Sequence, residues 1–157
     1  MLFRGNVDTR LGKLAVGEVD ATLLAAAGLD RLGRHDTGVA IPFDEMLPAP
    51  AQGAVGIETL ADGRARALVA AIDHADTHRA VAVERALLAV LAADCHSPVA
   101  ALARVEEGGV SLRAQLLTER GDESVEGVMR AGDEVGAALA HDLLARAPAA
   151  VRRLFAG

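Results

Sequence analysis

Apolar positions in the first sixty residues predict short buried strands joined by helical turns. The near-continuous apolar run from Val19 to Ala27 and the Val- and Ile-containing run from Gly53 to Leu60 are typical of buried parallel strands. Asn6 or Asp8 could cap a helix that extends to about Gly17. The other expected elements are a short apolar start over 1–3, a helical turn over 28–33, and a loop over 34–51 that holds three of the five prolines.

From Asp62 onward the pattern changes to helices followed by segments of alternating polarity. Such segments separated by Gly-containing turns predict an antiparallel sheet, and alternation leaves one of its faces solvated. The expected elements are helices over about 63–73 and 77–92 capped by Asp62 and Asp76, strands over 99–106, 110–118 and 123–130, and a helix capped by Asp133 that ends before Pro148.

The two halves of the pattern therefore predict different fold classes, α/β followed by α+β. Residues 62–157 should form a complete unit, in which a three-stranded antiparallel sheet has helices packed on it. Residues 1–60 should hold only part of a parallel sheet, because parallel strands need neighbours on both sides and cover on both faces.

Composition and charge restrict the function further. The chain has 157 residues, of which 52% are hydrophobic, so it can form an ordered core. A net charge of −6 argues against a nucleic-acid partner, and no apolar run is long enough for a membrane span. The single cysteine excludes an internal disulfide and fits a reducing compartment. We therefore expect a cytoplasmic protein.

Three motifs stand out along the chain. They are Arg-Gly-Asn-Val-Asp-Thr-Arg at 4–10, Pro-Ala-Gln-Gly at 50–53 followed by Ala-Val-Gly-Ile-Glu-Thr, and Glu-Arg-(x)9-Cys-His-Ser-Pro-Val around Cys95. Together they resemble porphobilinogen deaminase, also called hydroxymethylbilane synthase. The likeness starts at the first residues and covers the later part of such an enzyme. It implies a partial periplasmic-binding-protein-like domain over 1–46, a hinge and return strand of the first domain over 47–61, and a third, cofactor-anchoring domain over 62–157.

Cys95 is the strongest candidate for chemistry. The residue type favours burial, whereas its place in a loop beside Pro98 favours exposure. The resemblance implies that Cys95 holds a dipyrromethane cofactor through a thioether. The two residues before it are Ala93 and Asp94, where the family has two glycines, so a positive φ at Asp94 would be strained.

The resemblance gives binding roles to five further residues. Pyrroles with acetate and propionate groups need cationic partners, and arginine binds carboxylates through paired hydrogen bonds. From the residues alone, solvated arginines, an Arg31–Asp30 pair and a plain turn at Gln52 and Gly53 are the alternatives. The implied cofactor-binding residues are Arg4, Arg10, Gln52 and Gly53 beside Cys95, and the implied substrate-binding residues are Arg10 and Arg31.

The remaining polar groups suggest no further site. His74 and His78 have a spacing that can bind zinc, but a third ligand is lacking, so we expect no metal. The resemblance implies that the catalytic aspartate precedes the matched part, and we assign no catalytic residue here. The expected function is the later portion of a transferase that polymerises four porphobilinogen units with release of ammonia, inactive alone.

Two kinds of partner follow from this interpretation. The first is porphobilinogen with its oligomers, together with the earlier portion of the enzyme supplied in trans. The alternative function is a non-catalytic binding or oligomerisation module that self-associates through unpaired strands.

Overall fold

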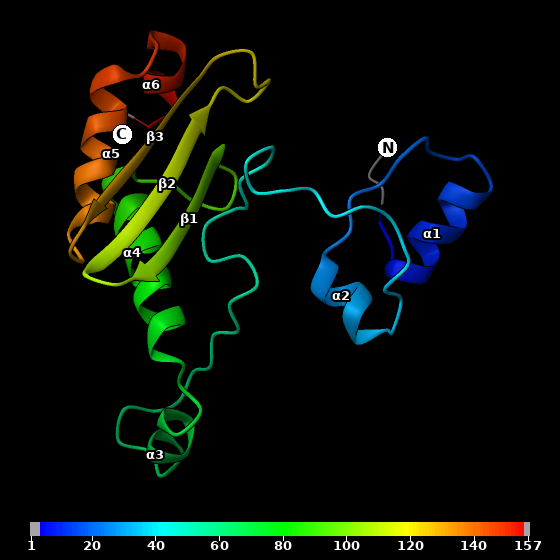
Figure 1. Ribbon diagram of the computed structural model, residues 1–157, viewed down its shortest axis with the longest axis horizontal. Helices are drawn as coiled ribbons and strands as arrows, with labels where there is room; N and C mark the ends of the chain where they lie inside the picture. The colour runs from blue at the N-terminus through cyan, green and yellow to red at the C-terminus, as the bar shows by residue number, and fades with distance from the viewer. Residues whose placement is uncertain (1–3, 156–157) are drawn as a thin grey trace. The chain divides into compact units, whose positions relative to one another are not determined.

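The computed structural model describes residues 4–155, and these divide into two units, Met1–Pro42 and Phe43–Gly157 (Figure 1). The expected apolar start over 1–3 lies outside the described residues. No helix among the residues described is long and apolar enough to cross a membrane.

The first unit consists of two short helices joined by extended chain. Helix α1 (Val7–Ala15) begins where the Asn6 side chain accepts a hydrogen bond from Thr9 N at 2.9 Å, so Asn6 rather than Asp8 is the N-cap. Helix α2 (Ala26–Arg31) corresponds to the predicted turn but begins two residues earlier. Between residues 4 and 42 no side chain is buried.

The second unit is built on an antiparallel sheet in the order β1-β2-β3, as predicted. The pairing Ala101↔Ala114↔Gly127 fixes the register. Each strand falls within one residue of the range expected from the sequence. The strands are β1 (Val99–Glu106), β2 (Gly109–Leu117) and β3 (Ser124–Ala131).

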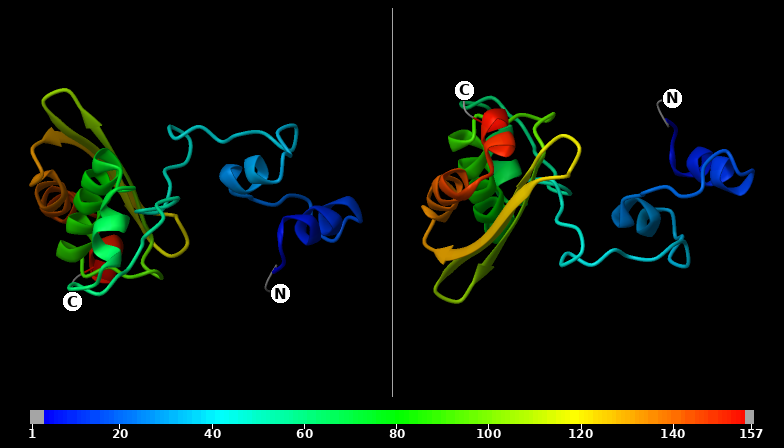
Figure 2. Two further views of the ribbon diagram at one scale, coloured as in Figure 1. Left: turned by 90° about the horizontal axis from the view of Figure 1, so that it is seen from below. Right: turned by 90° about the horizontal axis from the view of Figure 1, so that it is seen from above.

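Helices α4 (Ala75–Val90) and α5 (Val135–Arg146) cover one face of the sheet (Figures 1 and 2). Leu112, Ala114 and Leu116 point into this layer and are fully buried, which confirms the alternation read from the sequence. Helix α6 (Ala149–Phe155), which the sequence analysis missed, adds Val151 and Phe155 to the core.

The segment that enters the second unit lies against the opposite face of the sheet and the open edge of β1. Ala101 N donates to Pro48 O at 3.0 Å, and the Arg113 guanidinium donates to Phe43 O at 3.3 Å. Leu47, within this segment, is buried. Residues 43–48 are therefore bound to the sheet before the chain turns toward α3 (Ala65–Ala70).

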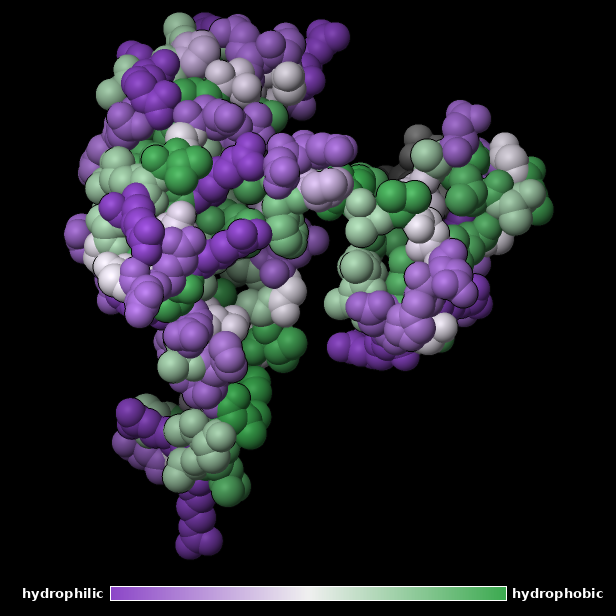
Figure 3. All heavy atoms as spheres, in the orientation of Figure 1, coloured by the Kyte–Doolittle hydropathy of each residue, from purple (hydrophilic) through white to green (hydrophobic). Residues whose placement is uncertain are grey.

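The two predicted parallel strands do not form in the described chain. Residues 19–25 and 54–60 have no regular secondary structure and pair with no strand. A strand requires hydrogen bonds to a neighbour, and neither segment has one in the described chain. Val55 is 83% exposed and Leu60 82% exposed, and Figure 3 shows hydrophobic side chains along the segment before α3. The α/β expectation for the first sixty residues is thus reduced to helices and extended chain.

Three predicted helix caps were also wrong. No Asp62 side chain caps α3, and α4 begins with His74, whose Nδ1 accepts from Thr77 N at 3.2 Å. Asp76 lies within the first turn of α4, where its charge complements the helix dipole. Asp133 instead pairs with Arg79 Nε at 2.6 Å, which links the start of α5 to α4.

Candidate functional site

Cys95 lies in the loop between α4 and β1, and its side chain is exposed. The chain leaves α4 through Ala92, which has a φ of 49°, and Ala93 N donates to Leu88 O at 3.0 Å. At the other end, Pro98 O accepts from Leu117 N at 3.1 Å, which ties the loop to β2. The thiol is therefore presented to solvent from a loop fixed at both ends, as its position in the sequence indicated.

Asp94 organises this loop through its own carboxylate. Its Oδ1 accepts hydrogen bonds from His96 N at 2.9 Å, from Ser97 N at 3.1 Å and from Ser97 Oγ at 3.1 Å. The His96 N–H, followed by the Ser97 hydroxyl, lowers the pKa of Asp94 below its ordinary value. Positive φ occurs at Ala92 and not at Asp94, so the expected strain at Asp94 is absent.

Gln52 and Gly53 lie together in a tight turn. Gln52 Oε1 accepts from Ala49 N at 3.1 Å, and Gln52 N donates to Ala49 O at 3.1 Å. Ala51 has a φ of 58° and Gly53 a φ of 82°, so the turn uses two left-handed residues. The side-chain oxygen of Gln52 is engaged within the turn, which leaves its amide N–H groups as the donors available to a ligand.

The carboxylate of Glu84 on α4 holds this turn. Glu84 is 6% exposed, and its Oε2 accepts from Ala51 N at 2.6 Å. Its Oε1 accepts from Ala103 N in β1 at 2.7 Å. One buried side chain thus joins helix, sheet and turn.

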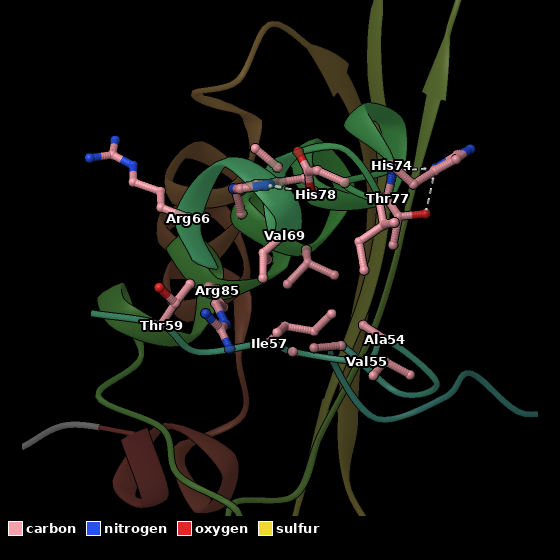
Figure 4. Close-up of a pocket in the computed structure, with 17 residues that line it drawn as sticks. Ala54, Val55, Ile57, Thr59, Arg66, Val69, His74, Thr77, His78 and Arg85 are labelled. Atoms are coloured by element: carbon pink, nitrogen blue, oxygen red, sulfur yellow. Dashed lines mark hydrogen bonds and ion pairs between the residues drawn. The ribbon is translucent and has the colours of Figure 1, made fainter. Parts of the chain in front are cut away.

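A cavity of about 790 Å³ opens between residues 51–59, α3 and the part of α4 up to Arg85 (Figure 4). Its lining is largely apolar, and Arg66, His74, His78 and Arg85 add polar groups. Arg66 extends away from the other labelled side chains in Figure 4. Cys95 is not among the lining residues, so the cavity and the cysteine loop are separate features of the second unit.

The candidate arginines belong to the first unit. Arg10 donates from Nε to Gly5 O at 3.1 Å and from a terminal nitrogen to Leu23 O at 3.4 Å, so part of its guanidinium holds the turn before α1. Arg4 and Arg31 are exposed. Asp30 pairs with His35 at 3.2 Å and not with Arg31.

The two histidines with zinc-like spacing have other partners. His74 caps α4, and His78 Nδ1 lies 3.2 Å from Asp73 Oδ1. Between residues 4 and 155, no group of three or more His, Cys, Asp or Glu side chains is arranged to hold a metal ion.

Sequence reasoning located the cysteine loop and the Gln52 turn but gave no role to Glu84. The only signal was its presence in the Glu-Arg-(x)9-Cys motif, because its partners Ala51 and Ala103 are 33 and 19 residues away along the chain. Arg66 and Arg85 at the cavity were also missed, since nothing in the sequence indicated that residues 51–59 face α3.

Comparisons with known proteins show the family to which the chain belongs. Residues 1–67 match the family model described as porphobilinogen deaminase, dipyromethane cofactor binding domain. Residues 78–145, which include Cys95, match the model described as porphobilinogen deaminase, C-terminal domain. The chain belongs to the porphobilinogen deaminase family, a family of transferases in tetrapyrrole biosynthesis, which confirms the resemblance read from its motifs.

Curated relatives agree with this assignment. Porphobilinogen deaminase from Sphingopyxis alaskensis is 60% identical over 99% of this chain and 50% of the relative. The same-named protein from Paracoccus denitrificans is 45% identical over 94% of this chain and 49% of the relative. The protein of the same name from Nitrobacter winogradskyi is 42% identical over 98% of this chain and 51% of the relative. The chain therefore spans about half the length of the curated relatives it matches.

Proposed function

We propose that this chain provides the cofactor-anchoring portion of a hydroxymethylbilane synthase, the transferase that joins four porphobilinogen units and releases ammonia. The observation that carries this proposal is the exposed thiol of Cys95 in a loop fixed at both ends, within the region that matches the C-terminal domain model. An exposed thiol can become the thiolate nucleophile that a thioether requires.

The groups around the cysteine fit a dipyrromethane with acidic side groups. When bound, the dipyrromethane supplies the primer to which pyrrole units are added. Cys95 would hold it covalently, and the free amide N–H groups of Gln52, with the backbone at Gly53, would contact its rings. Arg4 and Arg10 would bind cofactor carboxylates, and Arg10 and Arg31 those of the substrate, because guanidinium stays charged at any working pH.

We assign no catalytic residue within the chain, and we retain the division into 1–46, 47–61 and 62–157 as a proposal. Alone, the chain should bind no cofactor covalently and should give no turnover. Its cytoplasmic location is likewise an expectation from the family.

Trans-complementation tests the proposal. The chain is mixed with the N-terminal half of the Sphingopyxis alaskensis relative and porphobilinogen, product absorbance is followed, and the intact mass of the chain is measured. We expect turnover and a mass increase on Cys95 in the mixture, and neither with Cys95→Ser. Association of the two parts without product or mass increase would reject the proposal.

A second candidate is an oligomerisation module. The unpaired, exposed segment 54–60 favours it, since unpaired backbone in an apolar segment can pair with another chain. Size-exclusion chromatography with light scattering tests it. A monomer at high protein concentration would rule it out.

A further inference from the structure

We propose that Glu84 is a positioning residue that fixes the Gln52–Gly53 turn against the domain that carries Cys95. The role of that turn in pyrrole contact rests on the proposed function. The attachment of the turn by Glu84 is independent of that function, so it can be tested on the chain alone.

The burial of Glu84 is unusual for a residue of its charge. It is the one charged or polar residue that is buried among those described, at 6% exposure. Within the described range no Lys, Arg or His forms an ion pair with it, and its partners are the N–H groups of Ala51 and Ala103. A buried carboxylate is costly unless donors compensate it, so this pair of short hydrogen bonds defines what the residue does.

The geometry distributes these bonds over three elements. Glu84 comes from the middle of α4, Ala103 from the middle of β1, and Ala51 from the turn. Ala103 N–H would otherwise be an unsatisfied donor at the edge of the sheet, because β1 pairs only with β2. The carboxylate therefore accepts one hydrogen bond from the open edge of β1 with one oxygen and binds the turn with the other.

The turn needs such an attachment because its backbone is strained. Ala51 has a φ of 58°, a conformation that side chains with a Cβ rarely adopt. The hydrogen bond from its N–H to Glu84 stabilises that conformation. The conformation of Ala51 in turn determines how the following residues, Gln52 and Gly53, are oriented. Arg85, next to Glu84 on α4, faces the cavity, so the same stretch of helix serves both features.

Amide hydrogen exchange by NMR tests the assignment on the 157-residue chain. In the unaltered protein, Ala51 N–H should be protected although the residues after it are exposed; an unprotected Ala51 amide would overturn the proposal even if no variant folds. In Glu84→Gln the side chain keeps its shape but has one acceptor oxygen. Exchange at Ala51 should rise at least about tenfold, as expected for the loss of a bond to a charged group.

Two comparisons separate positioning from general stabilisation. The matched variant Glu119→Gln, on an exposed glutamate, should leave every amide unchanged. In Glu84→Gln, the amide of Ala114 at the centre of the sheet should stay within about twofold of its original rate. An equal rise at Ala51 and Ala114 would mean that Glu84 only stabilises the fold, and would overturn the positioning role.

A rescue variant adds a readout that a purely structural role would not move. Ala51→Gly removes the Cβ that opposes positive φ, so in the Glu84→Gln background it should restore part of the order of the turn. If the complemented mixture turns over, Glu84→Gln should raise KM for porphobilinogen several-fold more than it lowers kcat. No turnover in any mixture would reject the proposed function while the exchange result stands by itself.

Discussion

Gly136 on α5 packs directly against α4, and replacing it should destabilise the second unit. A Cβ built at this position would fall well inside van der Waals contact with Val83 O and would lie 3.0 Å from Ala86 Cβ. Val83 O is backbone and cannot rotate away. Gly136→Ala must therefore push the two helices apart.

The expected magnitude is a balance of two effects. Alanine is the better helix former by about 1 kcal/mol, whereas forcing an extra methyl group into a packed site costs about 1–3 kcal/mol. Because the obstacle is backbone, we expect the upper part of that range and a net loss of about 1–2 kcal/mol. For a unit of this size each kcal/mol lowers Tm by roughly 4 °C, so Tm should fall by about 4–8 °C.

Thermal and urea unfolding followed by far-UV circular dichroism measure this change. Gly12→Ala is the matched control, because no heavy atom lies within 4 Å of a Cβ built at Gly12 in α1. It should not lower Tm. An unchanged or raised Tm in Gly136→Ala would show that α4 and α5 are farther apart than described, and the reasoning about their contact would be wrong.

Other predictions concern the core, the cysteine loop and the start of α4. Leu116→Ala should cost about 2–5 kcal/mol in urea unfolding, whereas Val128→Ala, 66% exposed, should change stability by less than about 0.5 kcal/mol; similar losses would contradict the assignment of faces. Because the pKa of Asp94 is lowered in the folded loop, its bonds stabilise the loop above the ordinary carboxyl range and are lost as pH falls through the lowered pKa. The NMR shift of the His96 amide should follow that titration and lose it in Asp94→Asn; a persistent titration would implicate another group. His74→Ala should weaken the first turn of α4 by about 1 kcal/mol, seen as faster amide exchange there, while His74→Asn keeps the cap; equal exchange in both variants would argue against capping.

The sequence predicted best those elements whose partners are near in the chain. The strands of the sheet were placed within one residue, because each hairpin pairs neighbouring segments and the alternation of Leu112, Ala114 and Leu116 fixes the buried face. The helix before Cys95 was also predicted, and the position of Cys95 in a loop favoured the exposure that the structure shows, whereas its residue type favoured burial. These features depend on patterns that a short window contains.

The predictions that failed concern residues whose structure depends on partners far away along the chain. The Gly53–Leu60 run has the composition of a strand, but a strand is a property of a pair and this segment has no partner among the described residues. Asp133 has the chemistry of a cap but is bound by Arg79, 54 residues earlier. Pro148 was taken only as the end of a helix, although proline also favours the start of the next one, and α6 follows it directly.

The two units differ in the interactions that stabilise their conformations, and this difference decides which of the proposed functional residues have a fixed geometry. Cys95 and Glu84 belong to a unit whose core is closed by α4, α5, α6 and the sheet, so their surroundings are set by buried apolar contacts. Residues 4–42 have no buried side chain, and a segment that buries little gains too little to offset the loss of chain entropy. Its order depends on caps and exposed polar bonds such as the Asp8–Arg34 pair at 2.6 Å, which contribute little each. The thiol loop is therefore pre-formed, whereas the arginines of the first unit depend on further contacts, such as an anionic ligand, to gain a comparable geometry.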